Sequence, residues 1–313
     1  MAKLLANRLR TVIGSVISDT QSAFIKGRHI LDGILVANEV VDKAKKCNKD
    51  LLLFKVDFEE AYDSVDWKYM EDVMEKMAFP TLWRKWMREC VTTASSSVLV
   101  IGRPTDQFSL AKGLRQGDSL SPFLFLLAVE GFHVMTGSLI SNNILSNYKA
   151  GKKMALSISD VQVIDDTLIL GERSLANVRA MRAVLHLFTA MSGSKVNFHK
   201  SELVGVNVPQ SWLLEAATIL NCKVGSLPIL YLGLPVGGDP RRLNFWNLVV
   251  NRIKSRLSGW KSRHPFFSWP PCCPYVCRDF APCLCYFLLQ SSVRYHCLYW
   301  ISFNSFFLGW VWG

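Results

Sequence analysis

Two apolar runs that each end in acidic residues place the strongest constraint on how this chain can fold. The run Leu51–Val56 is followed directly by Asp57. Much later, the run Val161–Ile164 is followed by Asp165 and Asp166. Short apolar runs of this kind are typical of buried β-strands. If both strands end at the same edge of one sheet, their carboxylates can bind a hard cation such as Mg²⁺, which prefers oxygen ligands. The alternative is that the paired aspartates only form a hairpin turn.

Composition limits the classes of protein to which the chain can belong. Its 36 Lys and Arg residues against 25 Asp and Glu give a net charge of +11, which suits a polyanionic partner such as nucleic acid. Lys3, Arg8 and Arg10 interrupt the first apolar steps, so we expect no secretory signal. Arg294 and His296 interrupt the best apolar stretch near the end, so we expect no membrane span.

The periodicity of apolar residues predicts a mixture of helices and strands. Thr81 is a candidate cap for a helix that buries Leu82, Trp86 and Cys90. The whole pattern predicts an α+β fold with an antiparallel sheet backed by helices. The expected helices are Ile30–Lys46, Asp66–Met77, one beginning near Thr81, one beginning at Ser121 and running towards Met135, and Ser174–Ala190; the expected strands include Leu51–Phe58, Ser97–Ile101 and Gln107–Leu110.

A glycine-containing loop, residues 113–122, precedes the helix expected at Ser121. Its two glycines let the main chain approach a ligand closely. Arg115 and Gln116, which lie between those glycines, can contact a phosphate, a sugar or a base. The loop is therefore a candidate binding segment.

The acidic strand ends and this loop occur in the order found in a known family. Together they resemble the polymerase palm of reverse transcriptases, and more narrowly the reverse transcriptase of non-LTR, LINE-type retrotransposons of plants. The resemblance covers about residues 3–263. The motifs that carry it are Leu5–Leu9, Gln21–Arg28, Phe54–Asp63, Gly113–Pro122, Val163–Asp166, Ser192–Asn197 and Leu230–Pro235.

The resemblance implies an enzyme, an RNA-directed DNA polymerase. Its substrates would be dNTPs, an RNA template and a DNA primer. Asp57, Asp165 and Asp166 match the carboxylates that hold two Mg²⁺ ions, with Mn²⁺ as an alternative, against the primer 3′-hydroxyl and the nucleotide phosphates. The resemblance implies a nuclear or cytoplasmic location, and oligomeric state cannot be read from the sequence.

Further site residues follow from the same resemblance. Tyr62 matches the aromatic residue that lies under the nucleotide sugar and disfavours a ribose; the alternative is a tyrosine that only packs in the core. Gln116 and Gly117 match the loop that positions template and nucleotide. Lys195 matches a lysine near the leaving phosphate, with a solvated surface lysine as the alternative. Arg28 is expected to face nucleotide phosphates or template.

The expected domains follow the family order. Residues 1–50 are expected to form part of the fingers, 51–206 the palm, and 207–263 the primer-grip region and part of the thumb. A thumb helix over Phe245–Arg263 would contact a duplex through basic residues; the alternative is a solvated charged face. Residues 264–313 are rich in Cys, Trp and Phe and contain few charges, so we interpret them as an aberrant tail rather than a native domain.

The chain departs from the family pattern beside the paired aspartates. Val163 and Ile164 stand where the family usually has an aromatic and then a small residue, and a displaced carboxylate can cost roughly 100-fold in rate. Relative to the family, the chain also starts inside the fingers region, and the tail stands where the thumb sequence should continue after Arg263, which suggests a copy truncated at both ends. The alternatives to an active polymerase are therefore an impaired remnant that at most binds nucleic acid, or a non-functional pseudogene product.

Overall fold

The computed structural model describes residues 1–146, 148–150, 156–158, 160–163, 166–238, 245–247, 250–251 and 255. The chain divides into two compact units, Met1–Ser226 and Leu227–Gly313. In the first unit the helices are α1 (Ala2–Val16), α2 (Ile30–Lys46), α3 (Trp67–Lys76), α4 (Thr81–Thr92), α5 (Ser121–Ser141), α6 (Leu175–Ser192) and α7 (Gln210–Leu220).

A five-stranded sheet organises the first unit. Its order is β13-β12-β1-β10-β9, and its pairs are antiparallel except for β12 with β13. Its strands are β1 (Leu51–Val56), β9 (Asp160–Val163), β10 (Asp166–Gly171), β12 (Glu202–Val206) and β13 (Lys223–Val224). The shorter strands are β2 (Phe58–Glu59), β3 (Ser95–Ser96), β4 (Leu99–Val100), β5 (Arg103–Pro104), β6 (Phe108–Ser109), β7 (Tyr148–Ala150), β8 (Leu156–Ile158) and β11 (Lys195–Val196).

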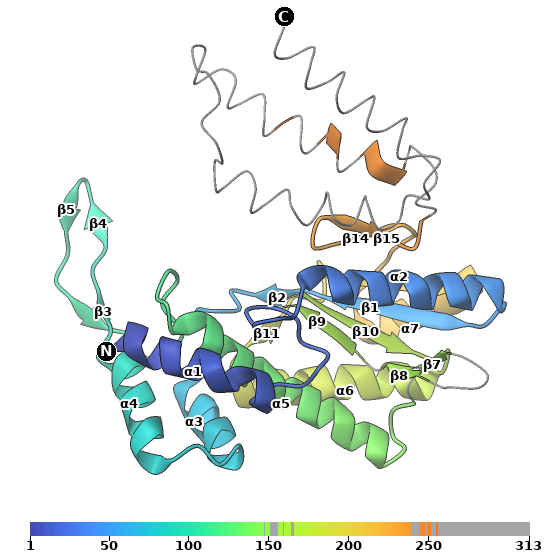
Figure 1. Ribbon diagram of the computed structural model, residues 1–313. Helices are drawn as coiled ribbons and strands as arrows, with labels where there is room; N and C mark the ends of the chain where they lie inside the picture. Colours follow the sequence, from blue (N-terminus) through green and yellow to red (C-terminus); the bar gives the residue numbers. More distant parts are fainter. Residues whose placement is uncertain are drawn as a thin grey trace, which may run out of the picture. The chain divides into compact units, whose positions relative to one another are not determined.

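Helices cover both faces of this sheet. Helix α2 lies along one face, and α5 and α6 lie along the other (Figure 1). Because side chains alternate along a strand, β1 serves both layers. Leu52, Phe54 and Val56 pack in the core formed with α3, α5 and α6, which leaves Leu51 and Leu53, also fully buried, for the α2 face. The α+β architecture expected from the sequence is confirmed.

Helix α5 is the central helix of the first unit. It is long and apolar enough to cross a membrane, but more than half of its most apolar stretch is buried inside the protein, as in the core helix of a folded domain. The sequence placed the cap of this helix at Ser121. In the structure Leu120 occupies that position, and its N–H donates to Oδ1 of Asp118 at 2.9 Å.

The buried face of α4 differs from the prediction. Pro80, not Thr81, is the cap residue, and Leu82 is 59% exposed while Met87 and Val91 are buried. Residues 82, 86 and 90 obey the same four-residue spacing as 83, 87 and 91, so periodicity could not choose between the two stripes. Contact with α1 and α3 buries Met87 and Val91 most deeply, while the predicted Trp86 and Cys90 are partly buried against the same core.

The turn after α4 is also tighter than predicted. The expected strands Ser97–Ile101 and Gln107–Leu110 leave residues 102–106 for the turn, but β4 pairs with β5 directly across Ile101 and Gly102. Both residues have left-handed φ angles, 50° and 75°, as a two-residue hairpin turn requires. Beyond this hairpin, β3 pairs with β6.

The second unit contains a small hairpin of β14 (Ile229–Tyr231) and β15 (Leu234–Val236). Leu232 and Gly233 form its turn with left-handed φ angles of 53° and 80°, and Tyr231 is fully buried. Residues 245–247 are helical. The rest of the expected thumb helix and the tail lie largely or wholly outside the described residues.

Candidate active site

The register of the central strands brings two of the predicted carboxylate positions to one edge of the sheet. In the pairing of β1 with β10, Val56 lies opposite Thr167. Asp57 directly follows the end of β1, and Asp166 is the first residue of β10, so both lie next to the Val56–Thr167 pair at one end of these adjacent strands. Asp165 and the side chain of Asp166 lie outside the described residues.

Main-chain contacts fix Asp57 against a second segment. The N–H of Asp57 donates to Oγ of Ser201 at 3.1 Å, and the carbonyl of Asp57 accepts from the N–H of Asn197 at 2.8 Å. Strand β2, just after Asp57, pairs with β11, where Lys195 lies opposite Glu59. Lys195 is exposed. The structure therefore places Lys195 beside the strand end that carries Asp57.

Tyr62 stands on a tight turn that follows Asp57. The carbonyl of Glu60 accepts from the N–H groups of Asp63 and Ser64 at 2.9 and 3.0 Å, which closes this turn. The ring of Tyr62 stacks on Phe125 of α5, with centroids 4.7 Å apart and planes 15° apart. Tyr62 is half-buried and Phe125 is 2% exposed. Phe125 was not among the predicted site residues, because in the sequence it is only one of many apolar residues in its helix.

The glycine-containing loop is bound to the same turn through its main chain. The N–H of Leu114 donates to the carbonyl of Tyr62, and the N–H of Gly113 donates to that of Val65, both at 2.8 Å. Gly113 has a φ of 87°, and a Cβ there would lie 2.6 Å from the carbonyl oxygen of Asp63. Only glycine allows this close approach.

The polar side chains of the loop contact neighbouring segments. Nε2 of Gln116 donates to Oδ2 of Asp63 at 3.4 Å, and Nη2 of Arg115 donates to the carbonyl of Cys90 at 3.0 Å. Gly117 has a φ of 89° and open space where a Cβ would point. The structure thus brings the loop and the turn of Tyr62 together.

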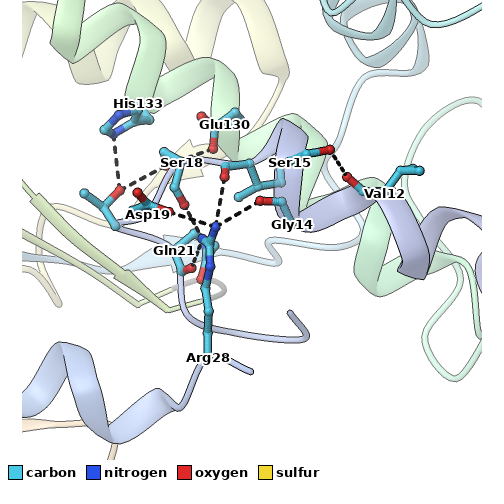
Figure 2. Close-up of polar contacts among 11 residues, drawn as sticks. Val12, Gly14, Ser15, Ser18, Asp19, Gln21, Arg28, Glu130 and His133 are labelled. Atoms are coloured by element: carbon cyan, nitrogen blue, oxygen red, sulfur yellow. Dashed lines mark hydrogen bonds and ion pairs between the residues drawn. The ribbon is translucent and has the colours of Figure 1, made fainter. Parts of the chain in front are cut away.

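Arg28, which is predicted to face nucleotide phosphates or template, binds main-chain carbonyls near its own segment. Its guanidinium donates to the carbonyls of Gly14, Ile17, Ser18 and Gln21 at the end of α1 and in the connector that follows it (Figure 2). It also forms an ion pair with Asp19 at 3.1 Å. Its side chain is 19% exposed. Contact with a phosphate remains a prediction, and it would compete with these bonds.

The same connector is bound to α5. Oγ of Ser18 donates to Oε2 of Glu130 at 3.1 Å, and Thr20 contacts Nδ1 of His133 at 3.3 Å. Glu130 is buried. The connector that binds Arg28 is therefore held against the central helix by the polar contacts of Ser18 and Thr20 (Figure 2).

Comparison with known proteins identifies the fold as one already known. The profile of the family described as reverse transcriptase (RNA-dependent DNA polymerase) matches residues 1–236. The chain is 25% identical over 275 residues to the transposon TX1 uncharacterized 149 kDa protein of Xenopus laevis, which covers 83% of this chain and 19% of that protein. It is 22% identical over 203 residues to the retrovirus-related Pol polyprotein from type-2 retrotransposable element R2DM of Drosophila melanogaster, which covers 65% and 18% of the two chains.

A solved structure is also similar. Telomerase from Candida albicans, in complex with the TWJ fragment of telomeric RNA, matches 75% of this chain and 35% of its own at 14% identity, with a TM-score of 0.49. The chain spans less than a fifth of the lengths of the two transposon proteins above. The family profile, in contrast, covers most of the chain, including the central sheet and the helices that pack on it. With its polymerase palm of sheet and helices, the chain belongs to the reverse transcriptase (RNA-dependent DNA polymerase) family.

Proposed function

We propose that this chain catalyses RNA-templated DNA synthesis, adding a nucleotide from a dNTP to the 3′-hydroxyl of a DNA primer. The observation that carries the proposal is the register of β1 with β10, which brings Asp57 and Asp166 to adjacent strand ends. Family membership supplies the reaction class. Asp165 precedes Asp166 in the sequence and completes the set of three carboxylates.

The donor chemistry of this strand edge fits divalent metal ions. Carboxylate oxygens are the ligands that Mg²⁺ prefers, and Mn²⁺ accepts the same ligands. Among the residues that the structure describes, no group of three metal-binding side chains is assembled. We assign Asp57, Asp165 and Asp166 as the ligands of two Mg²⁺ ions. When bound, such ions stabilise charge on the attacking and leaving oxygens of a phosphoryl transfer.

The protein residues around this edge are assigned to nucleotide and template. The turn that carries Tyr62 begins three residues after Asp57, so its ring is assigned to the nucleotide sugar. Arg115, Gln116 and Gly117 belong to the loop that is bound to the Tyr62 turn, and they are assigned to nucleotide and template. Lys195 is exposed beside Asp57, where its ammonium group can offset charge on the leaving phosphate.

The partners follow from charge and from the reaction class. A net charge of +11 suits a polyanionic template and primer, whose binding is dominated by phosphate contacts. We assign residues 1–50 to the fingers, 51–206 to the palm and 207–263 to the primer grip and thumb. The hairpin of β14 and β15 is the segment assigned to the primer end.

Primer extension on an RNA template tests this proposal. The full chain, with oligo(dT) on poly(rA), dTTP and Mg²⁺, is expected to lengthen the primer. Asp57→Asn and Asp166→Asn should each reduce extension by at least about 100-fold, because displaced or missing catalytic groups cost this much. Asp72→Asn is the matched control, since Asp72 is exposed on α3. Normal extension by Asp57→Asn would refute the assignment.

A second measurement addresses the impaired remnant. Salt-sensitive binding of an RNA–DNA duplex without any extension, in Mg²⁺ or in Mn²⁺, would contradict the polymerase proposal. It would instead support a chain that only binds nucleic acid through its excess positive charge.

A further inference from the structure

Trp67 is the first residue of α3, and its side chain contacts the glycine-containing loop. Its indole Nε1 donates to the carbonyl oxygen of Gly113 at 2.7 Å, at the short end of the usual range for N–H···O bonds. Trp67 is half-buried and packs against the core of the first unit. The indole therefore joins a well-packed helix to a loop that is assigned to nucleotide and template.

The carbonyl that Trp67 binds belongs to a peptide unit that is held at both ends. This unit consists of the C=O of Gly113 and the N–H of Leu114, and its N–H donates to the carbonyl of Tyr62 at 2.8 Å. The N–H of Gly113 is bound in turn to the carbonyl of Val65. Of these three bonds, only the one from Trp67 depends on a particular side chain, because the other two join main-chain groups.

Two bonds fix the orientation of this peptide unit better than one. Rotation of the unit by half a turn would break both, since its C=O and N–H point in opposite directions. Gly113 lies on one side of the unit, and glycine tolerates the backbone angles that such a rotation needs. Without the indole donor, only the bond from Leu114 to Tyr62 would oppose the rotation.

The next part of the loop is held less firmly. Gln116 lies two residues after Leu114, and its side chain contacts Asp63 at 3.4 Å. This contact is exposed and longer than a usual hydrogen bond, so it restrains the amide weakly. The place of the Gln116 amide therefore depends on the main chain that leads to it.

We propose that Trp67 is a positioning residue for Gln116, because its indole N–H holds the peptide unit from which the rest of the loop extends. The inference rests on the proposed function, since it needs Gln116 at the nucleotide. A loop that adopts the binding-competent orientation for part of the time binds its ligand with an affinity reduced by that fraction. Loss of the bond should therefore weaken nucleotide binding and leave the chemical step nearly unchanged.

Primer extension by the full chain tests this, with oligo(dT) on poly(rA), Mg²⁺ and varied dTTP, and with kcat and KM measured separately. Trp67→Phe keeps an apolar ring and removes the donor. We expect the KM for dTTP to rise about two- to tenfold, the range that the net contribution of one hydrogen bond gives, and kcat to stay within about twofold. A purely structural role would instead lower kcat, because fewer molecules would be folded, and would leave KM unchanged.

A second variant keeps the packing of the ring. In benzothienylalanine, sulfur takes the place of the indole N–H, so this residue at position 67 removes the donor and keeps both fused rings. It should raise the KM for dTTP as Trp67→Phe does, and it carries the test if Trp67→Phe fails to fold. Trp83→Phe is the matched control, because Nε1 of Trp83 is buried and has no hydrogen-bond partner among the residues that the structure describes. This control should leave KM unchanged.

A double-mutant cycle tests whether Trp67 acts through Gln116. Gln116→Ala is expected to raise the KM for dTTP by itself, and adding Trp67→Phe should then raise it no further. Additive effects, or an unchanged KM in both variants of Trp67 while Gln116→Ala raises it, would overturn the inference and leave the proposed function intact. An unchanged KM in Gln116→Ala would overturn the assigned role of Gln116 and the inference with it. No extension by the wild-type chain would overturn the proposed function itself.

Discussion

Two glycines in one loop allow the cost of a close backbone contact to be measured. Gly113 and Gly117 both have left-handed φ angles, 87° and 89°. They differ in their surroundings, because a Cβ at Gly113 would lie 2.6 Å from the carbonyl oxygen of Asp63, whereas a Cβ at Gly117 would meet open space. Alanine at either position incurs the same backbone strain. Only alanine at Gly113 also meets a steric clash.

The expected losses of unfolding free energy follow from these two terms. A left-handed conformation costs a residue with a Cβ about 1–2 kcal/mol. Alanine also restricts the unfolded chain, which offsets about 0.4–1 kcal/mol. Gly117→Ala should therefore destabilise the protein by about 1 kcal/mol. Gly113→Ala should lose about 1–3 kcal/mol more, the usual cost of overpacking, because main-chain atoms of Asp63 must move.

Urea-induced unfolding of the full chain and of both variants, followed by far-UV circular dichroism, measures this difference. The shift at Asp63 should also disturb the hydrogen bond from Leu114 to Tyr62. Gly113→Ala should therefore lower primer extension as well as stability. Equal losses of unfolding free energy in the two variants would refute the reasoning, since both share the backbone term and only Gly113 has the contact.

Two further substitutions test buried polar contacts by the same unfolding measurement. Arg28→Ala should lower the unfolding free energy by at least about 2 kcal/mol, because the carbonyls bound by the guanidinium lose a charged donor. Arg28→Lys should recover only part of this free energy, because lysine lacks the planar fork of donors. Unchanged stability of Arg28→Ala with a raised KM for dNTP would instead favour the predicted phosphate contact. Arg103→Ala serves as the control, because Arg103 is exposed. Burial raises the pKa of Tyr69 well above its usual value of about 10, so the folded state keeps a proton that the unfolded state loses, and stability should fall as pH rises above 10. Tyr69→Phe should reduce this fall without removing it, since burial also raises the pKa values of Tyr148 and Cys222. It should cost about 1 kcal/mol of unfolding free energy at neutral pH, because the hydroxyl donates to the carbonyl of Ala128 at 2.9 Å; an unchanged alkaline decline would contradict the assignment.

The helices with clear end signals were predicted well. The bounds Ile30–Lys46 match α2, and Ser174, the first residue of the expected helix Ser174–Ala190, is the cap of α6, where its Oγ accepts from the N–H of Ala176. Asp66 likewise caps α3, by accepting from the N–H of Tyr69. These signals are local, so the sequence contains them. Helix α1 was not predicted, although Leu5, Leu9 and Ile13 form one buried stripe along it. The basic residues of this segment were interpreted for their charge, and the helical spacing of its apolar residues was missed.

Features that depend on packing between distant segments could not be read in this way. The buried face of α4 was predicted only in part: Trp86 and Cys90 pack against the core, but Leu82 is exposed, and Met87 and Val91 were missed. Two stripes with the same spacing compete, and only contact with other helices decides how deeply each is buried. The register of β1 with β10 belongs to the same class, because apolar runs predict strands but not which residues pair. The sequence supported a shared strand edge only through the resemblance to a family.

The site itself shows why motifs name some of its residues and miss others. Predicted positions such as Asp57 and Tyr62 have side chains with obvious chemistry. The contacts that hold them are main-chain bonds, from Asn197 to Asp57 and from Leu114 to Tyr62, which almost any residue could make. A core residue such as Phe125, whose ring stacks on that of Tyr62, is equally hidden among the apolar residues of its helix. Gly113 is the exception, because a backbone approach that only glycine permits leaves a visible residue in the sequence. Glycines in such loops are therefore the best sequence evidence for how a site of this kind is held together.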